Sequence, residues 1–278
     1  MDGMNTSRRH DQAADGTASA PRRVFLFVNG IHVLPGDAEG WTDRAVTWTH
    51  IHTDARGEKF EYATTFATRL IRQQARAEKF ARMIGYYAKS HHGGTEGTEW
   101  EINLVGHSNG CEIILRTLRF LQKETKGTKI GSIHLIAAAC EADFWRNGLN
   151  ELLADGLLGR ACVYVGGKDR ALKIAKATEP VLRMFGAGYG SLGLTGPINP
   201  LFVRAGCIET IVEPEFDHST WFEKGERFDR TMGMVTSQTD RTSRTELQKE
   251  WRGAADHTAE LRRPGSCTVV PRTQNANA

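Results

Sequence analysis

The chain has 278 residues, which is enough for one α/β domain with a large core or for two small domains. Its 36 basic and 33 acidic residues leave a formal charge of +3 and are spread along the chain, so the composition does not favour a nucleic-acid partner. Residues 1–21 contain no apolar signal core, and no apolar run is long enough to cross a bilayer. We therefore expect a cytoplasmic protein without a membrane span.

The cysteines show no metal-type spacing. Their number, five, is odd, and four of them lie in apolar segments, which favours buried free thiols over a disulfide framework. No metal and no organic cofactor is expected. The cysteines are Cys111, Cys140, Cys162, Cys207 and Cys267.

Strand-like and helix-like segments alternate between two polar ends, 1–21 and 262–278, which we expect to be disordered. Residues 58–90 are rich in Ala and Arg and are expected to form a long amphipathic helical region. A helix should also follow the strand at 101–105. The alternation predicts one α/β domain over 22–261, with a mostly parallel central sheet flanked by helices. Strands are expected at 24–28, 45–52, 101–105, 130–139, 161–165 and 207–213.

Residues 185–200 do not fit this alternation, because they are apolar but rich in Gly and Pro. Such a loop is a candidate lid or pocket wall, and a compact loop packed on the core is an equal alternative. Any lid or cap would have to come from 172–200. The glycines do not follow a strand and open a helix at nucleotide-site spacing, so no nucleotide site is expected.

The most informative motif follows the apolar strand at 101–105 and reads Gly106-His107-Ser108-Asn109-Gly110. In this context, G-x-S-x-G places its serine on a sharp strand-to-helix turn with the hydroxyl exposed above the sheet. A side chain at either glycine would crowd that turn. The alternative is an ordinary strand–turn–helix with a glycine-lined bend.

A nucleophilic serine needs a base, usually histidine, within hydrogen-bond reach. Three histidines follow Ser108 in the chain: His134, His218 and His257. His134 lies inside an expected strand and His257 in a polar C-terminal region. His218 follows the last expected strand by a few residues, where a base should stand, and is therefore the predicted base.

The base in turn needs a carboxylate to orient it. Asp169 lies just past the strand at 161–165, in a glycine-containing turn, and is the predicted acid. Asp143, which follows the preceding strand, is the rival. Asp217 is adjacent to His218 and could not easily face its ring.

An oxyanion hole needs two backbone N–H donors aimed at the developing negative charge. The first is expected from Asn109, which opens a helix whose dipole adds to the effect. The second is expected from Ile31, after an early strand, where Gly30 permits an unusual backbone angle. The expected substrate-binding residues are Asn29, Gly30, His32, His107 and Trp221.

With these residues the chain resembles the α/β-hydrolase superfamily, in particular its serine esterases and lipase-like members. Residues 28–32 stand where that family has its oxyanion loop, and 106–110 stand at its nucleophile elbow. Asp169 and His218 match its acid and base in order, and the resemblance covers about 22–227. The resemblance implies an α/β-hydrolase fold with a short Gly-rich lid-like insertion, and hydrolysis of a carboxylic ester through an acyl-enzyme.

The apolar 185–194 segment and the pair Trp221 and Phe222 beside His218 predict a small or medium ester with an apolar acyl group as the substrate. Esterases, thioesterases and amidases share this machinery. One alternative is a catalytically silent protein of the same fold that binds a ligand or partner. Another is a phage- or host-associated interaction protein that uses the basic helix face of 69–82. The oligomeric state stays open.

Overall fold

The computed structural model describes residues 22–31, 40–62, 73–89, 100–124, 128–184, 190–203 and 205–240. The two ends that the sequence predicts to be disordered, 1–21 and 262–278, lie outside these ranges. So do residues 185–189 and His32, for which the sequence predicts a lid segment and a substrate contact.

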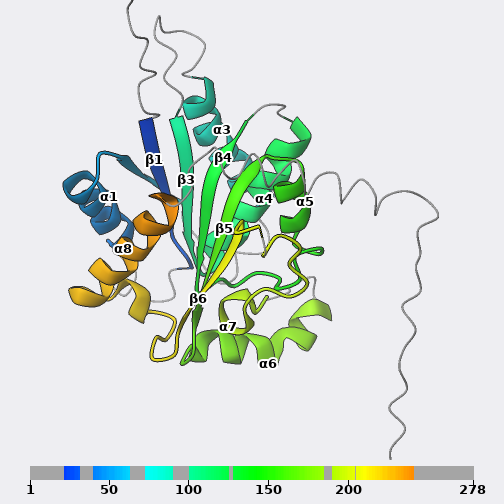
Figure 1. Ribbon diagram of the computed structural model, residues 1–278. Coiled ribbons are helices and arrows are strands. Elements are labelled where there is room, and N and C mark those ends of the chain that lie inside the picture. Colours follow the sequence, from blue (N-terminus) through cyan, green and yellow to red (C-terminus); the bar gives the residue numbers. More distant parts are fainter. Residues whose placement is uncertain are drawn as a thin grey trace, which may run out of the picture.

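Six parallel strands of the described chain form one sheet, in the order β2-β1-β3-β4-β5-β6 (Figure 1). The central strands are buried along nearly their whole length, as is typical of parallel strands covered on both faces. The predicted mostly parallel sheet is therefore confirmed. The strands are β1 (Arg22–Val28), β2 (Arg56–Phe60), β3 (Trp100–His107), β4 (Ile130–Ile136), β5 (Leu158–Gly166) and β6 (Ile208–Glu213).

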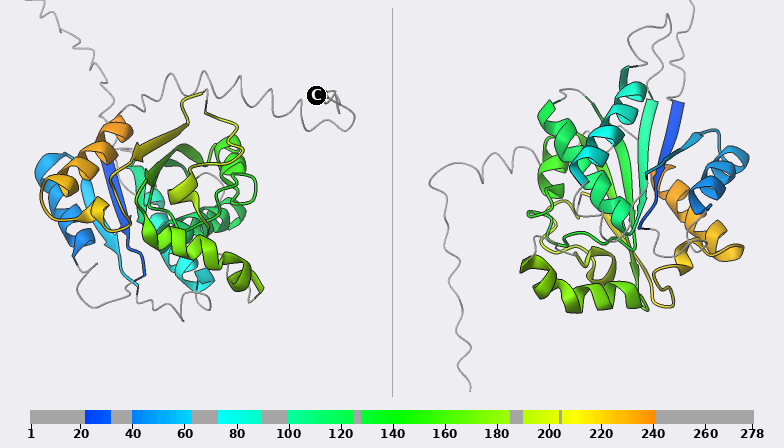
Figure 2. Two further views of the ribbon diagram at one scale, coloured as in Figure 1. Left: turned by 90° about the horizontal axis from the view of Figure 1, so that it is seen from below. Right: turned by 180° about the vertical axis from the view of Figure 1, so that it is seen from behind.

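Helices cover both faces of the sheet (Figure 2). On one face lie α1 (Trp41–His52) and α8 (Glu226–Asp240). On the other lie α3 (Gln73–Lys89), α4 (Asn109–Glu124) and α5 (Leu149–Ala154). Side chains alternate along a strand, so β1 contributes to the core on each face. Phe25 and Phe27 pack in the core under α1 and α8, and Val24, Leu26 and Val28 pack in the core under α3, α4 and α5.

The remaining elements gather beyond the carboxyl ends of the strands (Figure 1). They are α6 (Arg170–Met184), α7 (Leu192–Thr195) and the 3₁₀ turn η1 (Thr220–Phe222). In an open parallel sheet, this edge is where ligands bind. No helix in the described ranges is long and apolar enough to cross a membrane.

The predicted strand at 45–52 is wrong, because this segment belongs to helix α1. Its buried residues, Trp41, Ala45 and Thr49, recur every four positions and lie on one helix face. The sequence alternation of apolar and polar residues coincided with a strand pattern, but the burial follows the helical period.

The predicted helical region at 58–90 begins too early, since 58–60 belong to edge strand β2 and α3 begins at Gln73. Of its basic face, Arg69 and Arg72 lie outside the described part. Arg76 is buried, 7% exposed, and its guanidinium lies 5.2 Å from the centroid of the Tyr62 ring. This part of the face is packed, which removes support for a polyanion-binding surface there.

Of the predicted lid segment, 172–184 belong to helix α6 and 190–200 pack on the loop after β4. Leu192 N–H donates to the Cys140 carbonyl at 3.2 Å, and Gly193 N–H donates to the Ala138 carbonyl at 3.0 Å. A Cβ at Gly190 would lie 1.6 Å from the Cys140 carbonyl carbon, so glycine alone fits there. The cysteines in the described ranges are buried and form no disulfide: Cys111, Cys140, Cys162 and Cys207.

Candidate active site

Ser108 is the single residue between the end of β3 and the start of α4. Its φ is +53°, in the left-handed region that a serine rarely adopts. Its N–H donates to the Ile136 carbonyl at 3.0 Å, and its carbonyl accepts from the N–H groups of Cys111 and Ala139, each at 3.2 Å. The strained turn is therefore held from both sides, as in a nucleophile elbow.

The glycines of the motif permit close approach of backbone segments. A Cβ at Gly110 would lie 2.4 Å from the Val28 carbonyl oxygen, and one at Gly106 would lie 2.7 Å from Ile114 Cδ1. Helix α4 can therefore start directly against the end of β1.

The loop after β1 lies against the serine. A Cβ at Gly30 would stand 3.0 Å from Ser108 Cβ, and the Tyr62 hydroxyl donates to the Asn29 carbonyl at 2.5 Å. Asn109 is the first residue of α4, and the first N–H groups of a helix have no acceptor within it. The N–H groups of Asn109 and Ile31 thus belong to two segments that meet at Ser108.

The predicted acid and base face each other across two loops. His218 Nδ1 lies 2.8 Å from Asp169 Oδ2, and Asp169 is 0% exposed. The other carboxylate oxygen, Oδ1, accepts from Leu172 N–H at 2.8 Å, so Asp169 also caps α6. The side chain of His218 is 24% exposed, so a buried carboxylate orients a ring that still reaches solvent.

The rival acid, Asp143, serves a turn. Its Oδ1 accepts from Trp145 N–H at 2.9 Å, and its Oδ2 accepts from the Asn199 amide at 3.0 Å. The hydrogen bond from Trp145 lowers the pKa of Asp143. Asp217 Oδ1 likewise accepts hydrogen bonds from the N–H and hydroxyl groups of Ser219 and Thr220. Neither carboxylate pairs with His218.

His107 supports the base. Its Nε2–H donates to the His218 carbonyl at 2.9 Å, and its ring packs edge-on to Trp41 and Phe222. Burial lowers the pKa of His107 to about 3, so the ring is neutral. The sequence predicts a substrate contact for His107, but the structure shows a buried residue that fixes the His218 loop to the elbow.

Trp221 lies in the core. It is 0% exposed and packs edge-on to Phe216 and Tyr164, with ring centroids 4.8 and 5.7 Å away. Trp221 therefore has no exposed ring face with which to contact a substrate, although the sequence predicts such a contact.

Ser108 and His218 are connected through His107. No hydrogen bond between Ser108 Oγ and His218 is present in the described part of the chain. His107 adjoins Ser108 and binds the His218 backbone, and the His107 and His218 ring centroids are 4.9 Å apart. Catalytic hydrogen bonds are often long before a substrate binds, so this arrangement is compatible with a serine–histidine pair.

The other described histidine after the elbow, His134, lies inside the sheet as predicted. Its Nδ1 lies 2.9 Å from the Tyr164 hydroxyl, and its Nε2 lies 3.0 and 3.1 Å from the hydroxyls of Ser132 and Thr239. Burial lowers its pKa to about 3. Within the described residues, no group of three or more His, Cys, Asp or Glu could hold a metal ion.

The described chain therefore has an α/β fold, with a parallel sheet covered on both faces and a strained serine between β3 and α4. No protein-family model and no curated protein sequence matches the chain. Among solved structures the chain is similar to an uncharacterized protein from Bacillus cereus, with 14% identity and a TM-score of 0.45. That match covers 86% of this chain and 64% of the Bacillus protein, so the chain spans less than two thirds of its length.

Esterases and thioesterases predominate among the other matches. A Pyrococcus furiosus esterase is 10% identical over 81% of this chain and 83% of its own, with a TM-score of 0.46. Zea mays acyl-protein thioesterase 2 is 10% identical over 79% of this chain and 95% of its own, with a TM-score of 0.42. Likeness at this level says nothing about the reaction.

Proposed function

We propose that the chain is a serine hydrolase that cleaves carboxylic esters, with Ser108 as nucleophile, His218 as general base and Asp169 as the orienting acid. The observation that carries this proposal is the pairing of His218 Nδ1 with the fully buried carboxylate of Asp169. The His218 backbone is in turn hydrogen-bonded by His107, the residue before the strained Ser108. A buried carboxylate at Nδ1 leaves Nε2 as the nitrogen that can take the serine proton.

In the first step Ser108 Oγ attacks the ester carbonyl carbon while His218 Nε2 takes the hydroxyl proton. The N–H groups of Asn109 and Ile31 stabilise the tetrahedral oxyanion. The carbon–oxygen bond to the alcohol then breaks, the alcohol leaves with the proton from His218, and an acyl-serine remains. Water then attacks the carbonyl carbon of the acyl-serine while His218 Nε2 takes one of its protons. The bond to Ser108 Oγ breaks, Oγ receives the proton from His218, and the carboxylic acid leaves.

Trp221 is fully buried and Phe222 is 6% exposed, so the two aromatic residues beside His218 belong to the core. Their apolar character therefore does not support an apolar acyl pocket.

The test is covalent labelling with a fluorophosphonate, read by intact mass, together with turnover of para-nitrophenyl acetate. Wild type should gain one adduct. Ser108→Ala should gain none and lose about 10⁴-fold or more in kcat, because the nucleophile is absent. Ser237→Ala, which alters an exposed serine on α8, is the matched control and should label like wild type.

An adduct on folded Ser108→Ala, or undiminished turnover by it, would contradict the proposal. Absence of any adduct on well-folded wild type would favour a silent elbow in a binding protein.

A further inference from the structure

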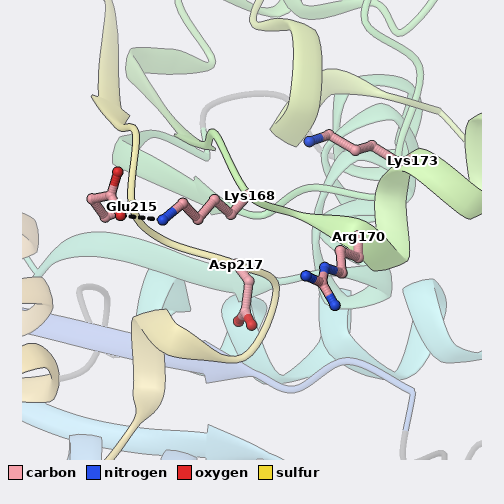
Figure 3. A pocket seen from close by; sticks show the side chains of 5 residues that line it. All are labelled: Lys168, Arg170, Lys173, Glu215 and Asp217. Carbon is pink, nitrogen blue, oxygen red and sulfur yellow. Dashed lines mark hydrogen bonds and ion pairs between the residues drawn. The ribbon is translucent and has the colours of Figure 1, made fainter.

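A cavity of about 510 Å³ is lined by five charged side chains, and three of them belong to chain neighbours of Asp169 or His218 (Figure 3). Lys168, Arg170 and Lys173 come from the start of α6 and the turn before it, and Glu215 and Asp217 come from the loop after β6. Small-molecule pockets have volumes of roughly 300–1,000 Å³, so the space suits one substituent or a small ligand.

The walls of the cavity are the chain neighbours of the pair itself. Lys168 and Arg170 flank Asp169 in sequence, and Asp217 precedes His218. The Lys168 N–H donates to the Phe216 carbonyl at 3.0 Å, which joins the two loops. The cavity and the His218–Asp169 pair are therefore built on the same two loops.

The charges of the cavity do not cancel. With three basic and two acidic side chains, its formal charge is +1. Lys168 pairs with Glu215, and Asp217 is bound by the N–H and hydroxyl groups of Ser219 and Thr220. The basic charges left for a ligand are those on α6.

Those charges belong to Arg170 and Lys173. Within the described ranges Arg170 has no hydrogen bond or ion pair, and Lys173 donates only to the Gly167 carbonyl at 3.1 Å. Three residues apart, the two side chains share a face of α6. A guanidinium presents paired donors that match a carboxylate, with the ammonium as a second point of attraction.

We infer that this cavity is a subsite for an anionic group, of carboxylate type, on the leaving alcohol of the ester. The inference rests on the proposed function, because His218 must deliver its proton to the leaving oxygen and so places the alcohol on its own side of Ser108. The preferred substrates are then esters of alcohols or phenols that carry a carboxylate.

The experiment compares para-acetoxybenzoate with its methyl ester, two substrates that differ in one negative charge on the leaving phenol. Rates are corrected for the reaction of each ester with hydroxide. Wild type should show the higher kcat/KM for the carboxylate, and added salt should shrink the difference because exposed charges are screened.

Arg170→Gln should lower the carboxylate-to-methyl-ester ratio of kcat/KM about fivefold, the upper range for an exposed ion pair. Adding Lys173→Gln should lower it further. Lys123→Gln, which removes a cation at the far end of α4, is the matched control and should keep the wild-type ratio.

A binding measurement separates this inference from the proposed function. Calorimetry should show that para-hydroxybenzoate binds more tightly than methyl para-hydroxybenzoate, and that Arg170→Gln removes the difference. If neither ester is turned over but this difference is found, the hydrolase proposal fails and the cavity remains an anion-binding site without a leaving alcohol. Equal binding of the two phenols, with a kcat/KM ratio that Arg170→Gln leaves unchanged, overturns the subsite even when both esters are hydrolysed.

Discussion

At Asp169 a single carboxylate serves two elements. Its Oδ1 caps α6 through Leu172 N–H, and its Oδ2 accepts from His218 Nδ1. The cap needs only an oxygen acceptor, whereas orientation of the histidine needs an acceptor at the second position as well. The two roles can therefore be separated by one substitution.

Asp169→Asn should lower kcat about 10³- to 10⁴-fold, because an amide nitrogen facing His218 favours the wrong tautomer. The melting temperature should fall little, since the amide oxygen can still cap α6. Asp143→Asn is the matched control and should stay within about twofold of wild type by the same steady-state assay. A larger loss from Asp143→Asn would reassign the acid.

At the scale of elements, the start of α4 is pressed against the end of β1. The contact leaves no room for a Cβ at Gly110, where the nearest atoms are the carbonyl oxygens of Val28 and Asn29 at 2.4 and 2.6 Å. These are backbone atoms of the loop proposed to hold the oxyanion. Packing and chemistry are therefore coupled at this junction.

Gly110→Ala should destabilise the protein by about 2 kcal/mol or more, as overpacked sites do, and should reduce kcat by displacing the 29–31 loop. Gly233→Ala, within α8, meets nothing within 4 Å and should stabilise by about 0.5–1 kcal/mol, as expected for Gly to Ala in a helix. Urea unfolding of both variants measures the contrast. Equal effects would show that the junction tolerates a side chain.

At the scale of the whole molecule, two neutral histidines are buried in separate parts of the structure. His107 lies under the His218 loop, and His134 lies between the sheet and α8. Burial lowers the pKa of each to about 3. The unfolded chain takes up these protons near pH 6.5, whereas the folded chain does so only near pH 3.

The stability due to these two groups is therefore fully present above about pH 6.5 and is lost as the pH falls towards 3. Between about pH 7 and pH 5.5 the contribution of the two rings to the free energy of unfolding should drop by about 2.5 kcal/mol. Urea titrations at both pH values measure the drop, and His134→Gln should roughly halve it. A pH-independent free energy of unfolding across this range would contradict the assignment of two neutral buried rings.

The central strands were predictable because each carries an apolar-rich stretch of its own. Edge strand β2 was not, since its residues are Arg, Gly, Glu, Lys and Phe and only one side of the strand is paired within the sheet. Helix α1 was mistaken for a strand because apolar residues on both of its sides hid the four-residue spacing of Trp41, Ala45 and Thr49.

The sequence by itself determined the Ser108 turn, because a strand, two glycines and a helix start define that backbone over a few adjacent residues. It also placed Asp169 and His218 at the carboxyl ends of the strands, because parallel strands all end on the same side of the sheet. Only the tertiary structure decided that Asp169 and not Asp143 meets His218, 49 residues away from Asp169 along the chain. It likewise buried Trp221 and turned His107 towards the His218 backbone, because such contacts depend on how separate loops pack and not on the residues adjacent in sequence.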